Sequence, residues 1–296
     1  MDWKQTVNSA LARSTGYELR RHGSSEAPPA RRARRSVREL RPGDRLLTAP
    51  VFVLCTLRSG STLLRVMLNS HSQLHAPHEI HLRYLSVQFD RKWSERSTKE
   101  MGLDAVGLEH LLWDRLLHRE LTRSGKPTIV DKTPNNVFIA DRLRECWPDS
   151  RFIFLLRHPA AIARSRAAIL GEGADHDENV DLIRRYCATL ESARSSYDGL
   201  TVRYEDVTTD PDPVTREICE FLGLEHEPGM VDYGRFDHGR YRSGLGDYAD
   251  KIKTGTIQEA EAPPEEVPEA LREACETWGY PIGAATAQPS RDATPR

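Results

Sequence analysis

The stretch Val51–His71, VFVLCTLRSGSTLLRVMLNSH, decides the fold of this chain. Its first seven residues, Val51–Leu57, form a short apolar run that is typical of a buried strand. Thr62–Leu68 instead carries its apolar side chains at helical spacing. Arg58–Ser61 connects the two segments, so the sequence predicts a strand, a tight loop and a helix in direct succession.

The same order recurs further along the chain. Apolar runs at Thr128–Val130 and Arg151–Leu156 are each followed by a helical pattern, and a helix predicted over Val180–Tyr197 leads to a fourth run, Leu200–Tyr204. Strands that are apolar throughout are typical of a parallel sheet that is buried on both faces. We therefore predict an α/β fold with three α/β/α layers, a central parallel sheet and a P-loop-like loop between the first strand and its helix.

Another helix is predicted over 102–123, where leucines recur at three- or four-residue spacing. We expect this leucine stripe to pack on the sheet. Its members are Leu108, Leu111, Leu112, Leu116 and Leu117.

The composition predicts one domain with a tail at each end. Residues 1–46 hold a weak helical pattern, a stretch rich in Gly, Ser and Pro, and six arginines between positions 31 and 41, and we interpret them as a partly disordered basic arm. Residues 47–283 form the predicted domain, and residues 284–296 are predicted to be a disordered tail. The 42 basic and 44 acidic residues give a net charge of -2, which favours neither nucleic acid nor a membrane as a partner.

Cysteine usage and hydropathy indicate the compartment. The five cysteines are scattered, odd in number and without a C-x-x-C pair, which argues against a disulfide framework and against a zinc site. No stretch approaches the roughly 18 apolar residues of a membrane span, and the N-terminus lacks the apolar core of a signal peptide. We therefore expect a cytoplasmic protein.

Polar and cationic residues follow three of the predicted strands. In a parallel α/β sheet, ligands bind beyond the carboxyl ends of the strands, and here these positions follow Leu57, Val130 and Leu156. Arg58–Thr62 lies at a helix N-terminus, where backbone N–H groups, the helix dipole and small hydroxyls favour a bound phosphate. Gly60 allows the backbone to approach such a group closely.

This loop departs from the nucleotide-triphosphate motif G-x-x-x-x-G-K-[ST]. Ser61 stands in the lysine position between Gly60 and Thr62. The third strand ends at Arg157, where a kinase would carry a magnesium-binding acid. Both departures argue against a kinase or NTPase, although a nucleotide kinase and a non-catalytic nucleotide-binding module stay open as alternatives.

Two segments carry a specific family resemblance. The stretch 51–71 resembles the 5′-phosphosulfate loop of sulfotransferases that use 3′-phosphoadenosine 5′-phosphosulfate (PAPS). RFIFLLRHPAAIARSRA, residues 151–167, resembles their 3′-phosphate motif, in which a serine follows a strand-end arginine by eight residues. In this sequence the two residues are Arg157 and Ser165.

Together with DKTP at 131–134 and VRYEDV at 202–207, the resemblance spans roughly Val51–Pro281. It is strongest to the bacterial branch that modifies small molecules and polyketide chains in secondary metabolism, and tyrosylprotein sulfotransferases are also similar. The resemblance implies a transferase that moves a sulfuryl group from PAPS to a hydroxyl of a small-molecule or carrier-bound acceptor. It further implies that 3′,5′-ADP is released and that no metal is needed.

The resemblance also implies roles for individual residues. The nucleotide-binding residues that it implies are Arg58, Ser59, Gly60, Ser61, Thr62, Arg157 and Ser165. Glu79 matches a catalytic glutamate that takes the acceptor proton, and Lys132 matches a catalytic lysine that, with Arg58, contacts the transferring sulfuryl group. A surface position for Lys132, or an ion pair between Lys132 and Asp131, stays open.

Three histidines lie around Glu79 at three-residue spacing: His75, His78 and His81. That spacing would bring them together only on a continuous helix, which Pro77 interrupts, and no fourth cysteine or histidine is near. The sequence therefore argues against a metal site. A histidine that acts as the base in place of Glu79 stays open.

A glycine-rich segment, YRSGLGDYADKIKTG at 241–255, falls where the family carries a mobile loop over the nucleotide, and it matches that element only loosely. Its glycines predict a lid that becomes ordered on binding. Arg242, Lys251 and Lys253 are the candidates for a further contact to the 3′-phosphate.

Overall fold

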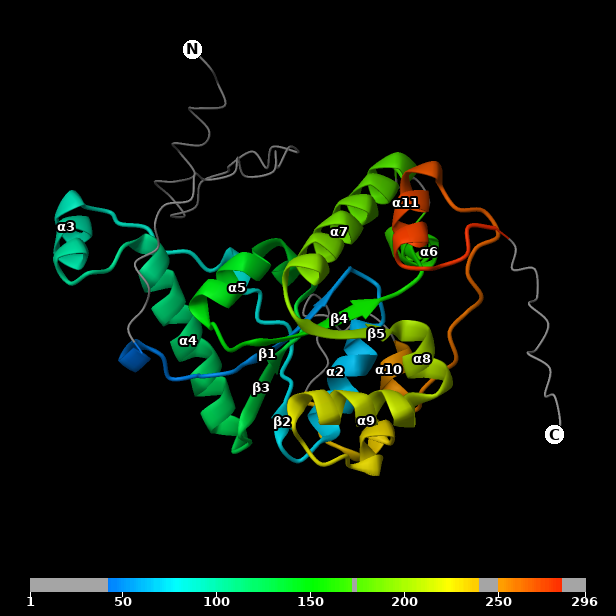
Figure 1. Ribbon diagram of the computed structural model, residues 1–296, viewed down its shortest axis with the longest axis horizontal. Helices are drawn as coiled ribbons and strands as arrows, with labels where there is room; N and C mark the ends of the chain where they lie inside the picture. Colours follow the sequence, from blue (N-terminus) through cyan, green and yellow to red (C-terminus); the bar gives the residue numbers. More distant parts are fainter. Residues whose placement is uncertain (1–41, 172–174, 240–249, 284–296) are drawn as a thin grey trace, which may run out of the picture. The chain divides into compact units, whose positions relative to one another are not determined.

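The computed structural model describes residues 42–171, 175–239 and 250–283 (Figure 1). Most of the predicted basic arm (1–46) and all of the predicted tail (284–296) lie outside these residues, so both stay predictions. Within the described part of the chain, no helix combines the length and the apolar character needed to span a membrane.

The centre of the fold is a parallel sheet of five strands in the order β2-β3-β1-β4-β5. The strands are β1 (Val51–Cys55), β2 (Leu74–His75), β3 (Thr128–Asp131), β4 (Arg151–Leu156) and β5 (Gly199–Arg203). The predicted α/β fold is confirmed, and each of the four predicted strands is present. The sequence does not predict the edge strand β2, because two residues carry no periodic pattern.

Helices connect the strands and cover both faces of the sheet (Figure 1). The α-helices are α2 (Ser61–Ser70), α3 (Lys92–Glu100), α4 (Ala105–Ser124), α5 (Ala140–Cys146), α6 (Pro159–Leu170), α7 (His176–Ser196), α8 (Tyr204–Thr209), α9 (Pro211–Leu222), α10 (Asp250–Lys253) and α11 (Glu269–Thr277). The 3-10 helices are η1 (Pro42–Asp44), η2 (Leu82–Tyr84), η3 (Pro134–Ile139), η4 (Pro228–Val231) and η5 (Tyr233–Arg235).

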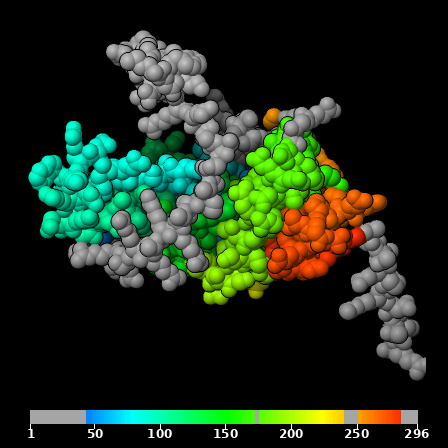
Figure 2. Space-filling view, turned by 90° about the horizontal axis from the view of Figure 1, so that it is seen from above, coloured from blue at the N-terminus to red at the C-terminus, as the bar shows by residue number. Residues whose placement is uncertain are grey.

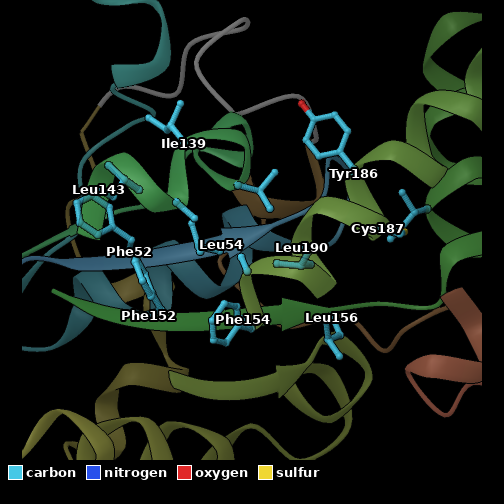
Figure 3. Packing of buried hydrophobic residues seen from close by; sticks show 14 of the residues in the cluster. Phe52, Leu54, Ile139, Leu143, Phe152, Phe154, Leu156, Tyr186, Cys187 and Leu190 are labelled. Carbon is cyan, nitrogen blue, oxygen red and sulfur yellow. The ribbon is translucent and has the colours of Figure 1, made fainter. Parts of the chain in front are cut away.

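Alternate side chains of the strands point to opposite faces of the sheet. Phe52 and Leu54 of β1 pack with Phe152 and Phe154 of β4 on the face that α4, α5, α6, α7 and α11 cover (Figure 3). Val53 points to the other face, where α2, α8 and α9 pack. Every residue of β1 is therefore buried, as the uninterrupted apolar run predicts.

The carboxyl end of β1 lies where the order of the strands reverses. From β1 the chain runs through α2 to β2 at one edge of the sheet, and it returns through β3 to the side of β1. It then crosses to β4 on the other side of β1. Because ligands of open α/β sheets bind in the crevice at such a reversal, the fold favours a ligand at the loop between β1 and α2.

The buried face of α4 differs from the predicted leucine stripe. Leu112 is 44% exposed, whereas Trp113 and Asp114 are buried. Asp114 accepts hydrogen bonds from the Leu47 backbone N–H at 3.1 Å and from Trp147 Nε1 at 2.9 Å. These donors compensate for burial of the carboxylate. The stripe prediction is wrong at Leu112, whereas Leu117 is buried in the core and Leu116 packs against it.

Candidate active site

The loop after β1 leads into the N-terminus of α2. Gly60 is the N-cap residue, and its carbonyl oxygen accepts from the backbone N–H groups of Leu63 and Leu64 at 3.0 and 3.4 Å. Glycine has no side chain that could cover the first-turn N–H groups of the helix. These groups and the positive end of the helix dipole favour an anion at this position.

Glycine is required at position 60 for two reasons. Its φ of 80° lies in the left-handed region, which side chains disfavour. A Cβ atom there would also come within 2.1 Å of Cδ2 of Tyr204. The Tyr204 ring therefore packs directly on the backbone of the loop.

Two other loop residues have distinct conformations. Arg58 has a φ of 58°, and such strained backbone clusters at functional sites. Ser59 is fully buried, and its hydroxyl donates to the Thr56 carbonyl oxygen at 2.9 Å. The Ser59 side chain thus closes the loop from inside, so a ligand contact by Ser59 would come from its backbone.

Two arginines from different strand ends meet beside this loop. Arg157 follows β4, and its Nη1 donates to the Arg58 carbonyl oxygen at 2.7 Å. The Arg157 guanidinium lies 4.4 Å from the centroid of the Tyr204 ring. Arg58 Nε in turn donates to Ser165 Oγ on α6 at 3.4 Å, across 107 residues of sequence. The structure thus brings together the residues of both predicted phosphate motifs.

These residues surround a pocket of about 520 Å³ at the carboxyl ends of β1 and β4, which we call the strand-end pocket. Of the predicted nucleotide-binding residues, those that line it are Arg58, Gly60, Ser61, Thr62, Arg157 and Ser165. Apolar side chains such as Leu57 and Ile169 also line it. Its volume and mixed lining are typical of a small-molecule or cofactor site.

The segment after α10 closes one side of this pocket. Lys251 lines the strand-end pocket and donates to Glu261 Oε1 at 3.0 Å. Lys253 lines a neighbouring pocket of about 480 Å³, and Arg242 lies outside the described residues. The chain that follows packs against α6 and α7 through α11 (Figure 2). Among the three predicted candidates, Lys251 is thus the one that the described part of the chain brings to the pocket.

A buried ion pair lies at the other side of the pocket. Lys132 Nζ donates to Glu79 Oε1 at 2.5 Å. Lys132 is 1% exposed and Glu79, which lines the pocket, is 8% exposed. The alternative of a surface position for Lys132 is therefore wrong.

Asp131 does not pair with its neighbour Lys132. Its carboxylate accepts from the Thr133 hydroxyl and from Asn136 Nδ2, each at 2.8 Å. Burial raises the pKa of this carboxyl above its usual value. The idea that Asp131 orients Lys132 is wrong, because Glu79, 53 residues away in sequence, is the partner.

The three histidines of this region have separate surroundings. His75 Nε2 lies 3.4 Å from Glu120 Oε1, and burial lowers the pKa of its imidazole. His78 is exposed, and His81 Nε2 lies 3.4 Å from Glu79 Oε2. Within residues 42–171, 175–239 and 250–283, no group of three His, Cys, Asp or Glu side chains is arranged to hold a metal ion.

Cys55 is the last residue of β1 and directly precedes the loop that leads to α2. Burial raises the pKa of its thiol to about 11, although the charge of Lys132 and hydrogen bonds with Ser61 and Ser59 act in the opposite direction. The thiol is therefore protonated at neutral pH and is a poor nucleophile.

Several residues of the pocket carry no predicted role, and Tyr204, Arg164 and Asn135 are among them. Tyr204 contacts both the Gly60 backbone and the Arg157 guanidinium. The VRYEDV motif points to the segment of Tyr204. A motif alone does not show which of its side chains faces the loop after β1, so the contact becomes visible only in the fold.

Comparison with known proteins identifies relatives of this chain. A sequence model of the sulfotransferase family matches residues 50–228, more than half of the chain. The nodulation protein NoeE of Sinorhizobium fredii is 30% identical over 138 residues, which are 42% of this chain and 33% of that protein. Protein-tyrosine sulfotransferase 2 of Gallus gallus is 25% identical over 190 residues, 59% of this chain and 51% of that protein. The chain thus spans between a third and about half of the length of these relatives.

Two solved structures share the fold over most of the chain. The sulfotransferase domain from the curacin biosynthetic pathway has a TM-score of 0.59 at 21% identity and covers 80% of this chain and 99% of that one. The sulfotransferase domain from the Synechococcus PCC 7002 olefin synthase has a TM-score of 0.59 at 20% identity. The match covers 84% of this chain and 100% of that domain. Identities this low show the fold alone. The family match over residues 50–228 adds the family: this chain belongs to the sulfotransferase family.

Proposed function

We propose that this protein transfers a sulfuryl group from PAPS to a hydroxyl group and releases 3′,5′-ADP. The observation that carries the proposal is the convergence of three features on one pocket. These are the loop before α2, the residues Arg157 and Ser165, which each hydrogen-bond to Arg58, and Glu79, which forms an ion pair with Lys132. Their order and their placement at the strand ends support the assignment that the family resemblance implies.

The donor would lie across the loop and α6. In this proposal the first-turn N–H groups of α2 and the Gly60 backbone hold the 5′-phosphosulfate. Arg157 and Ser165 bind the 3′-phosphate, because a guanidinium and a hydroxyl offer several donors to phosphate oxygens. Lys251 supplies a further cation at the same pocket.

The transfer itself needs a base and positive charge. Glu79 accepts the proton of the acceptor hydroxyl while the acceptor oxygen forms a bond to sulfur. The bond between sulfur and the bridging oxygen breaks, and its electron pair stays on the departing 3′,5′-ADP. Arg58, which lines the pocket, and Lys132, which is buried next to Glu79, supply positive charge that stabilises the sulfuryl oxygens and the bridging oxygen. None of these steps requires a metal ion.

A small-molecule or carrier-bound hydroxyl is the acceptor class that we propose, within secondary metabolism. The two similar structures are sulfotransferase domains from the curacin biosynthetic pathway and from an olefin synthase. A coupled assay for 3′,5′-ADP, run with PAPS and a panel of phenolic, sugar and carrier-bound hydroxyls, tests the proposal. Absence of acceptor-dependent 3′,5′-ADP across such a panel would count against it.

Replacing Arg157 with alanine is expected to weaken 3′,5′-ADP binding by roughly 10- to 100-fold, because the variant loses a charged hydrogen bond that contributes about 1.5–3 kcal/mol. Binding of 5′-AMP should change much less, because it lacks the 3′-phosphate. Arg151→Ala is a matched control, since Arg151 begins the same strand and donates to Phe221 O at 3.3 Å. Isothermal titration calorimetry measures the affinities of wild type and both variants for the two nucleotides. Equal weakening of both nucleotides would remove Arg157 from the 3′-phosphate site.

Replacing Gly60 with alanine is expected to weaken 3′,5′-ADP binding by more than about 10-fold, because the new Cβ displaces the Tyr204 ring or the loop. Gly125→Ala is the matched control. Gly125 has a similar φ of 71°, but a Cβ there meets nothing within 4 Å. Both variants carry the strain of a left-handed residue, whereas only Gly60→Ala should lose the nucleotide. Equal affinities in the two variants would contradict the contact.

A further inference from the structure

The Glu79 carboxylate has a basic neighbour at each of its oxygens. Lys132 Nζ lies 2.5 Å from Oε1, and His81 Nε2 lies 3.4 Å from Oε2. The His81 side chain is 29% exposed and lines the strand-end pocket beside Glu79. Lys132 is 1% exposed and does not line the pocket, so His81 is the neighbour of Glu79 that does.

The backbone of His81 is held in an uncommon conformation. Its φ of 58° and ψ of 43° are left-handed, and among the described residues only Arg58 shares a positive φ without being glycine. Thr133 Oγ1 accepts from the backbone N–H groups of Ile80 and His81 at 3.1 and 3.4 Å. The Thr133 hydroxyl itself donates to the buried Asp131. The Asp131 network thus fixes the turn that brings the imidazole to Glu79.

The surroundings of the His81 ring indicate its tautomer. Nδ1 is buried and has no hydrogen-bond partner among the described residues. A buried N–H without an acceptor is rarer and more costly than a bare acceptor nitrogen. This favours the tautomer that carries a proton on Nε2, the nitrogen nearer to Glu79 Oε2. Nε2 and Oε2 lie 3.4 Å apart, which is an ion-pair distance and longer than a typical hydrogen bond.

We infer that His81 is a positioning residue for Glu79, whose Nε2–H orients the carboxylate through Oε2 while Lys132 holds Oε1. This inference rests on the proposed role of Glu79 as the proton acceptor. A carboxylate has about four lone-pair sites, so two donors leave room for the acceptor hydroxyl. The proton passes to Glu79, and His81 exchanges no proton with the acceptor.

A matched pair of variants tests this role. His81→Gln places an amide nitrogen close to the position of Nε2, whereas the shorter side chain of His81→Asn ends near the position of Nδ1. Asparagine tolerates the left-handed backbone at least as well as histidine, so a loss confined to His81→Asn cannot come from the backbone. His81→Gln should keep kcat within about threefold of wild type, and His81→Asn should lower kcat by roughly 10- to 100-fold. The dissociation constant of 3′,5′-ADP should stay unchanged in both.

A thermal-stability cycle tests the contact without turnover. The Tm losses of His81→Asn and Glu79→Ala should be less than additive in the double variant, because residues in contact share one interaction. Additive losses would overturn the contact. An equal, severe loss of kcat in both His81 variants would overturn the positioning role and identify His81 as the base. An unchanged kcat in His81→Asn would also overturn the positioning role. If the wild type transfers no sulfuryl group, the proposed function fails, while the stability cycle still decides the contact.

Discussion

Replacing Glu79 with glutamine is expected to lower turnover by about 10²- to 10⁴-fold, the range for loss of a general base. Glutamine keeps the shape of the side chain and one acceptor oxygen but cannot take a proton. Binding of 3′,5′-ADP should persist, because the nucleotide is assigned to the loop and to Arg157. A single-turnover measurement of sulfated product is the appropriate readout, since slow release of 3′,5′-ADP could otherwise hide the chemical step.

Glu259→Gln is the matched control for this variant. Glu259 also lines the strand-end pocket and loses the same charge on substitution, but it has no proposed role in proton transfer. Its single-turnover rate should stay near that of wild type. Near-normal turnover in Glu79→Gln, with loss of turnover in both His81 variants, would instead assign the base to His81.

The central part of the fold could be predicted because its signal is local. The apolar run of β1, the loop and α2 follow one another without interruption, so periodicity alone separates strand from helix. The face of α4 could not be predicted in this way. Asp114 is buried because Leu47 and Trp147 donate to it, and those donors are distant in sequence. Periodicity counts apolar residues and does not detect such compensated polar ones.

The same distinction between local and distant signals decides which parts of the candidate site could be predicted. Arg157 and Ser165 share one motif, so their spacing shows that they belong together, and the structure places both beside Arg58. No motif in the sequence indicates the partner of Lys132. Adjacency suggested Asp131, whereas the fold brings Glu79 to it from a segment before α4. Pairings between separate segments are set by strand order, which the sequence pattern leaves undetermined.

Replacing Lys132 with methionine is expected to have a large effect on stability as well as on turnover. Removing one member of a buried ion pair leaves an uncompensated charge, which typically costs about 3–5 kcal/mol of unfolding free energy. Turnover should fall too, because Lys132 is assigned to the transferring sulfuryl group. Equilibrium urea unfolding at neutral pH measures the loss of stability.

Two further variants distinguish the ion pair from a simple loss of packing. Lys99→Met removes the exposed pair between Lys99 and Glu95, whose Nζ and Oε1 lie 2.8 Å apart, and it should cost less than about 0.5 kcal/mol. The double variant Lys132→Met with Glu79→Gln removes both charges, so it should recover much of the stability lost in Lys132→Met while staying inactive. The stability loss of the double variant could instead equal the sum of the two single losses. In that case the loss in Lys132→Met does not come from burial of an unpaired carboxylate. The ion pair would then be a contact of the folded state that contributes little to its stability.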